Sequence, residues 1–384
     1  MTDPDPFDPA LLAHALGEVP LFREVQRVLA TQRGPVNWES ALKIARAVAM
    51  AGPAEGGSPE AGASPGEHSE FGEACRIAEL CAAQVPGLDP SPLLSSVEVV
   101  DRPTWAQATL GALRPVLERL GSRLGSQFGA AGLPLPLKMF ADALGPFYLG
   151  IQFGFFTGCL SWRALGRFDL CLPPDRPARH RVVPSNVAAL ERELGIDGRQ
   201  LRMWLAAREV VADLTFQSVP WAAPLLRGLV EEYVDAAGVD VPRVLARMQE
   251  LPPEALTRVS EHPEDLATML ATPAQEAVQA RLRVVVALLE GHLDWAVERV
   301  GTGMLADLAR IREGTSRRWA ERSTVERLFA RLLGVDLDPG QRRAGERFIR
   351  TVAAADRLPK LWADAGNIPS PEELVDPQAW LERV

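Results

Sequence analysis

The sequence has little of what marks disulfide-rich or nucleic-acid-binding proteins. Its 384 residues include only four cysteines, and none of them forms a CxxC pair. That number is low for a disulfide scaffold. Acidic residues outnumber basic ones by 50 to 41, which gives a formal charge of −9. A face that binds nucleic acid would instead require clustered basic residues, so we expect no nucleic-acid partner.

Signatures of nucleotide binding and of secretion are also missing. The chain contains neither a GxGxxG nor a GxxxxGK[ST] loop, the two glycine-rich devices that hold nucleotide phosphates. Its first residues, MTDPDPFDPALLAH, are acidic and have no basic stretch leading into an apolar run. They do not resemble a secretion signal. We therefore expect a protein of the reducing cytoplasm.

One apolar segment, residues 143–160, lacks charged side chains and carries glycine at every fourth position, at Gly150, Gly154 and Gly158. Such a stripe lets helices approach closely in membranes. The segment is only about the minimum length for a membrane span, and it contains Pro146. We expect a tightly packed core helix and no membrane partner. A membrane-associated helical protein is the alternative.

Composition and periodicity divide the chain into three parts. Residues 1–51 show helical periodicity. Residues 52–70, GPAEGGSPEAGASPGEHSE, are rich in Gly, Pro, Ser and Ala. They cannot bury enough apolar surface to offset the entropy lost on ordering, and so they predict a linker. Residues 71–384 are helical in pattern almost throughout and predict a helical domain.

Strand signals are few. Two short extended runs, residues 167–172 and 180–184, are separated by the turn-rich sequence PPDRPAR. They predict a small hairpin. The expected fold is therefore mainly α, with a helical core and at most a small β-hairpin or sheet.

Two helices have recognisable starts. The first is expected from about Gly198 to Gln217, after a capping box made by Asp197 and Gln200. The second is expected to start after Thr272, with proline at its first position, and to end near residue 300.

The first of these helices contains Arg208-Glu209-Val210-Val211-Ala212. In a zincin the same helix carries His-Glu-x-x-His, whose two imidazoles share one helix face and bind Zn²⁺ while the Glu acts as general base on the zinc-bound water. Arginine has no lone pair to offer a metal, and alanine has no ligating atom. Of the motif residues only Glu209 is retained, and a single glutamate does not by itself identify a zincin.

The surrounding sequence makes the motif informative. The run VVPSN…LRMWLAAREVVADLTFQSVPWAAPLL (182–226), the blocks LGRFDLCLP (165–173) and LLEGHLDWAVERVG (288–301), and the C-terminal region occur in order. Together they resemble an actinobacterial and chloroflexal family of zincin-like metallopeptidases, or candidate hydrolases. Some of its members are associated with deazaflavin coenzyme biosynthesis. The resemblance extends from about residue 145 to the end.

This resemblance implies that Glu290 is the position of the third zinc ligand, with His292 and Asp294 close by. Because Arg208 and Ala212 replace two of three protein ligands, we expect no bound zinc and no other cofactor. A carboxylate after the apolar run 284–289 is expected to be partly buried and to need a partner. We therefore predict that the Arg208 guanidinium takes the place of the lost cation and pairs with Glu290.

The favoured interpretation is a family member with a degenerate and catalytically inactive zinc site, acting in binding or scaffolding, with a peptide or protein in the remaining cleft. The alternative is an active metal-dependent hydrolase with non-standard ligands, namely Glu209, Glu290 and His292. A rebuilt site for Mg²⁺ or Mn²⁺ that also uses Asp213 is a variant of it. Each of the other histidines is isolated and is interpreted as structural or surface-exposed: His14, His68, His180 and His262.

Overall fold

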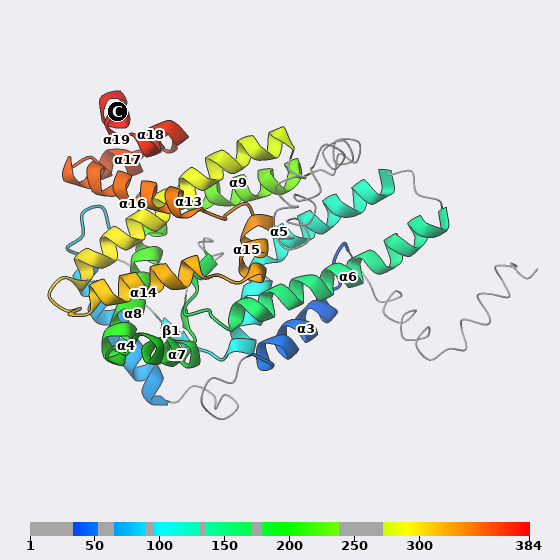
Figure 1. Cartoon of the computed structure of the whole chain (residues 1–384), viewed down its shortest axis with the longest axis horizontal. Helices are drawn as coiled ribbons and strands as arrows, with labels where there is room; N and C mark the ends of the chain where they lie inside the picture. Colours follow the sequence, from blue (N-terminus) through cyan, green and yellow to red (C-terminus); the bar gives the residue numbers. More distant parts are fainter. Residues whose placement is uncertain (1–33, 53–64, 89–95, 131–134, 171–178, 238–271) are drawn as a thin grey trace, which may run out of the picture.

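The computed structural model describes residues 34–52, 65–88, 96–130, 135–170, 179–237 and 272–384, and these parts are mainly helical (Figure 1). The first half contains α3 (Trp38–Met50), α4 (Pro65–Ala82), α5 (Arg102–Ala130), α6 (Leu135–Ser161), α7 (Pro184–Leu194), α8 (Gly198–Ser218) and α9 (Ala222–Ala236). The second half contains α13 (Pro273–Gly301), α14 (Leu308–Ala320), α15 (Thr324–Leu332), α16 (Pro339–Ala354), α17 (Leu358–Ala363), α18 (Pro371–Val375) and α19 (Pro377–Arg383). Short 3₁₀ turns are η1 (Phe168–Leu170) and η2 (Ala365–Asn367), and the strands are β1 (Ser96–Val99) and β2 (Arg179–Val182). The predicted mainly α fold is confirmed.

The apolar segment 143–160 lies within α6 and packs against α3 (Figure 1). A Cβ atom on Gly150 would clash with the backbone of Asn37, the N-cap residue of α3, and one on Gly154 would clash with the backbone of Ala41 within α3. The glycine stripe therefore serves close packing between two helices, as expected for a core helix. Among the described residues, no helix is both long enough and apolar enough to cross a membrane.

The small sheet differs from the predicted hairpin. Strand β2 pairs with β1 in parallel, with His180 opposite Val97 and Val182 opposite Val99. The described part of the expected partner run forms η1 at Phe168–Leu170, and within the described residues one antiparallel bridge, from Gly166 to Val182, joins this region to β2. Residues 171–178 lie outside the described residues. The hairpin prediction is wrong because it considered only neighbouring runs, whereas β1 lies about eighty residues earlier in the chain.

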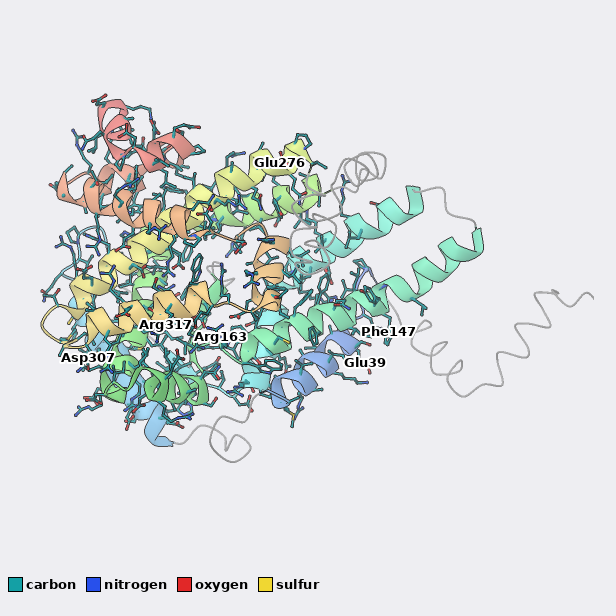
Figure 2. All side chains as sticks on the ribbon, viewed as in Figure 1. Glu39, Phe147, Arg163, Glu276, Asp307 and Arg317 are labelled. Atoms are coloured by element: carbon teal, nitrogen blue, oxygen red, sulfur yellow. The ribbon has the colours of Figure 1, made fainter. Side chains whose placement is uncertain are left out.

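The two helices predicted in detail are present, and local caps explain their starts. The Asp197 carboxylate accepts from the backbone of Arg199 at the start of α8, and the Thr272 hydroxyl accepts from Gln275 at the start of α13. The reciprocal half of the first capping box is absent. Gln200 instead accepts from the backbone of Asp307, the residue labelled in Figure 2 between α13 and α14.

Helices α8 and α13 contact each other and are surrounded by other elements, with α4 against α8, and α9 and α16 against α13. Most of their side chains are buried, so polar groups on them need partners inside the protein. Helix α4 begins at Pro65, so the last six residues of the predicted linker are helical. The side chain of Phe71 then anchors this helix in the core. Residues 1–33 and 53–64 lie outside the described residues.

Candidate functional site

The side chain of Arg208 reaches from α8 to two carboxylates of α13. Its Nη2 donates to both oxygens of Glu290, at 3.0 and 3.1 Å, and its Nη1 lies 3.4 Å from Oδ1 of Asp294. Arg208 and Glu290 expose 11% and 9% of their side chains. The pairing predicted from the sequence is confirmed, and the ion pair is largely shielded from water.

A second arginine, Arg342 of α16, contacts the same carboxylates. Its Nη2 lies 3.3 Å from Asp294 and 3.7 Å from Glu290, and its guanidinium carbon lies 5.3 Å from the centre of the Trp319 ring. Two cations thus face two anions, which compensates the burial of all four charges. Sequence reasoning missed Arg342, because no helical spacing relates α16 to α13.

These residues do not fit a catalytic zinc ion. Such an ion needs three protein ligands, two of them usually imidazoles one helical turn apart. Arg208 and Ala212 occupy those two positions and offer no ligating atom. The third expected ligand, Glu290, already contacts two guanidinium groups. Within the ranges that the structure describes, no three His, Cys, Asp or Glu side chains are grouped so that they could hold a metal ion.

Glu209, the retained residue of the motif, contacts the backbone at the start of η1, whereas Arg208 contacts Glu290 of α13. Its Oε1 accepts from the backbone N–H groups of Arg167 and Phe168, at 2.9 and 3.2 Å, and the residue is 1% exposed. Gly166 is required beside it, because a Cβ atom there would clash with the carboxylate. The side chain is therefore held in place by backbone contacts.

The other oxygen of Glu209 faces a buried polar cluster. His180 Nδ1 lies 4.0 Å from Glu209 Oε2 and 3.3 Å from Asp213 Oδ2, and Arg167 contacts Asp213 at 3.4 Å. His180 and Glu209 are almost fully buried, and Glu209 Oε2 and both ring nitrogens of His180 lack a hydrogen-bond partner among the described residues. Glu209 and Asp213 are four residues apart on α8 and share a helix face, so the sequence indicates that these two lie together. His180 lies on β2, and the sequence does not indicate that it joins them.

Burial sets the protonation of this cluster. Desolvation raises the pKa of Glu209 to about 8, with a contribution from the nearby charge of Asp169, and raises the pKa of Asp213 to about 6. Desolvation and the charge of Arg167 lower the pKa of His180 to about 4. At neutral pH, Glu209 therefore holds a proton and His180 is neutral. A protonated carboxyl is not poised to act as a general base.

His292 lies among aromatic rings. Its ring centre is 5.7 Å from that of Trp295 and 5.2 Å from that of Trp362, the latter in an edge-on arrangement. Burial lowers the pKa of His292 to about 4, so the ring is neutral at physiological pH. Of the isolated histidines, His14 and His262 lie outside the described residues.

A cavity of about 190 Å³ opens beside the Arg208–Glu290 pair. Its wall includes both of these residues together with Asp294, Trp204 and Trp319, from α8, α13 and α14. Arg208 and Glu290, which stand at positions of expected zinc ligands, line this cavity. Here it presents guanidinium groups and indole rings in place of a metal.

Comparison with known proteins agrees with this architecture. A crystal structure from Chloroflexus aurantiacus, of a candidate hydrolase with a novel fold, is similar to the chain with a TM-score of 0.64 and 22% sequence identity. The similarity covers 91% of this chain and 98% of that one, and at this identity it establishes the fold alone. No curated protein matches the sequence. The model of the zincin-like metallopeptidases matches residues 36–381, from just before α3 into α19. The chain therefore belongs to the zincin-like metallopeptidase family.

Proposed function

We propose that this chain is a zincin-like protein without zinc chemistry, which acts by binding a ligand in the cavity beside Arg208 and Glu290. The observation that supports this most strongly is the ion pair itself, in which Arg208 Nη2 lies 3.0 and 3.1 Å from the two oxygens of Glu290. A guanidinium is permanently charged and cannot be displaced by deprotonation, so it keeps a metal from that carboxylate.

The placement of the three residues named in the alternative also supports binding over metal-dependent hydrolysis. Glu290 contacts Arg208, Glu209 contacts the backbone at the start of η1, and His292 packs against Trp295 and Trp362. Among the described residues, neither Glu209 nor His292 lines the cavity. A hydrolase built from these three side chains would need them to converge.

The size of the cavity narrows the kind of ligand. At about 190 Å³ the cavity is smaller than typical ligand pockets of roughly 300–1,000 Å³. It suits a small molecule, or one end or one side chain of a longer peptide, better than an extended peptide. Scaffolding through this cavity would therefore depend on a short anchoring group.

Metal analysis of the purified full-length chain tests the proposal. The protein is produced in zinc-supplemented medium, separated from loosely bound metal, and measured by plasma mass spectrometry for zinc, manganese and other transition metals. We expect far less than one metal ion per chain and no chelator-sensitive hydrolysis of a general peptide substrate. A stoichiometric transition metal that is lost in Glu290→Gln would overturn the proposal and favour the hydrolase.

A further inference from the structure

The wall of the cavity carries five arginines and four acidic side chains. Four of the arginines have a carboxylate partner: Arg163 with Glu326, Arg208 with Glu290, Arg322 with Asp336, and Arg342 with Asp294. The fifth, Arg318, has none in ion-pair contact among the described residues. The remaining acidic side chain of the wall, Asp169, accepts instead from the backbone N–H groups of Leu165 and Gly166. Arg318 is therefore the arginine of the wall that has no direct carboxylate contact among the described residues, and the charges of Asp169, Glu193 and Glu326 act on it from farther away.

Arg318 lies in the last turn of α14, and one nitrogen of its guanidinium makes a hydrogen bond to the protein. Its Nη2 donates to the backbone oxygen of Arg163, and Arg163 Nη2 donates in return to the backbone oxygen of Arg318, at 2.8 Å. Arg163, labelled in Figure 2, lies just beyond the end of α6. This reciprocal contact positions the Arg318 side chain and uses only part of its hydrogen-bonding capacity, because a guanidinium has five N–H donors.

The surroundings of Arg318 make its charge costly. Burial, and then the neighbouring charge of Arg163, lower the pKa of Arg318 from its ordinary value, and the charges of Asp169, Glu193 and Glu326 offset only part of this shift. A charge held in such a place is stabilised by an opposite charge nearby. The backbone oxygen of Arg163, just beyond the end of α6, accepts one hydrogen bond from Arg318 but supplies no full counter-charge, since a helix C-terminus carries only about half an elementary charge.

The rest of the wall is suited to an apolar group. Trp204 and Trp319 present indole rings, and Leu160, Val286 and Leu337 add aliphatic surface. Ligand sites typically combine a mostly apolar lining with a few polar groups that fix orientation. One unpaired guanidinium beside apolar walls in a small cavity matches a ligand with one negative charge and an apolar body.

We propose that the cavity binds a small organic monocarboxylate, with its carboxylate on Arg318 and its apolar part against Trp204 and Trp319. This rests on the proposed binding function and names its ligand class. The guanidinium fork matches the two oxygens of a carboxylate, which would give Arg318 the direct carboxylate contact that it lacks among the described residues. A phosphate dianion would bring two charges to a site with one unpaired cation. The carboxylate belongs either to a free small molecule or to the C-terminus of a peptide.

Isothermal titration of the full-length protein tests this with defined probes. Benzoate represents a free monocarboxylate, acetyl-phenylalanine represents a peptide C-terminus, benzamide is the neutral analogue of benzoate, and inorganic phosphate is the competing anion. Arg318→Gln removes the charge, and Arg318→Lys keeps it without the fork. Arg317→Gln is the matched control, because Arg317 is the preceding residue on α14 and exposes 49% of its side chain.

We expect at least one carboxylate probe to bind, and to bind more tightly than benzamide or phosphate. Its affinity should fall by about tenfold or more in Arg318→Gln, the loss expected for a charge-assisted hydrogen-bond pair. It should fall less in Arg318→Lys and remain unchanged in Arg317→Gln. The tighter of the two carboxylates identifies the source of the ligand.

Three results would overturn the inference: no binding of either carboxylate, equal binding by wild type and folded Arg318→Gln, or preference for phosphate. If Arg318→Gln does not fold, the comparison between Arg318→Lys and wild type decides. The same samples are analysed for metal. A metal-free protein that binds no carboxylate contradicts only this inference, whereas stoichiometric zinc contradicts the proposed function.

Discussion

Arg208 and Glu290 are joined across α8 and α13 by a single nitrogen, Nη2, that contacts both carboxylate oxygens at 3.0 and 3.1 Å. The second nitrogen, Nη1, faces Asp294. The positive charge of Arg208 on α8 and the negative charges of Glu290 and Asp294 on α13 therefore compensate each other inside the protein. This arrangement makes the stability of the fold depend on a residue that, in a zincin, would be a metal ligand.

The first prediction follows from this contact. Arg208→Ala should lower the free energy of unfolding by about 3–5 kcal/mol, because it leaves Glu290 buried with less compensation. The matched control is Arg202→Ala on the same helix, where Arg202 pairs with Glu70 and the two side chains are 27% and 59% exposed. That change should cost about 0–1 kcal/mol. Equal costs in urea unfolding would show that the Arg208 pair is not a buried one.

The second prediction concerns pH. Unfolded Glu209 has an ordinary pKa of 4.5, and the folded chain raises it to about 8. Between these values the folded state holds a proton that the unfolded state lacks, so stability falls as pH rises through 8. Asp213 contributes in the same direction, but only up to about pH 6. His180 and His292 act oppositely, since their stabilisation is lost as pH falls below 6.5.

The window from pH 6.5 to just above 8 lies above the range in which Asp213, His180 and His292 contribute, and a Glu209 variant separates the Glu209 contribution from those of Asp169 and Asp294, whose pKa values burial also raises. Wild type should lose roughly 2 kcal/mol across it, and Glu209→Gln, which retains the acceptor for the Arg167 and Phe168 N–H groups, should remove that loss. Glu382→Gln, at an exposed glutamate, is the control and should keep the wild-type slope. Unfolding measured at several pH values decides, and parallel slopes for wild type and Glu209→Gln would contradict a protonated Glu209.

The third prediction concerns the glycine stripe of α6. Gly154→Ala should destabilise the protein by about 1–3 kcal/mol, because its Cβ would meet the backbone of Ala41 in α3. Gly228, an exposed residue of α9, has no atom near its Cβ direction and is not followed by proline. Gly228→Ala should instead stabilise by up to about 1 kcal/mol. Thermal unfolding of both variants checks this, and a stabilised Gly154→Ala would refute the close contact of the helices.

The fourth prediction concerns the two missing imidazoles. Arg208→His combined with Ala212→His places two histidines one turn apart on α8, near Glu290. This double variant should bind more zinc than wild type, measured as metal per chain after removal of loosely bound ions. Ala212→His alone should not, because it retains Arg208. A double variant as metal-free as wild type would show that the helix no longer holds zincin geometry.

Features encoded by neighbouring residues were predictable from the sequence. Helix α8 was expected at residues 198–217 and runs from Gly198 to Ser218. Its Asp197 cap and the Thr272 cap of α13 depend on residues within three positions of each other. The contact between Arg208 and Glu290 was also predictable. The resemblance to a zincin-like family implied that both residues stand at zinc-ligand positions and are therefore close together, which their spacing in the sequence does not indicate.

Features that depend on the approach of distant segments were not predictable. His180 has an ordinary sequence context, and only the pairing of β2 with β1 brings it to Glu209 and Asp213. Arg342 contacts Asp294 from another helix. Arg318 differs from the other arginines of the cavity wall because, among the described residues, no carboxylate contacts it directly. A single sequence does not encode such relationships in its local pattern.

The parallel pairing of β1 with β2 couples the chemistry of α8 to a distant part of the chain. His180 is held against Val97 by strand hydrogen bonds, and all of α5 and α6 lies between the two strands in sequence. If β1 separates from β2 while the helices remain folded, water gains access to the His180 side of Glu209. The carboxyl group then loses the desolvation that keeps it protonated and releases its proton near neutral pH. Opening of a two-stranded sheet thus becomes a proton-linked event inside an otherwise helical protein.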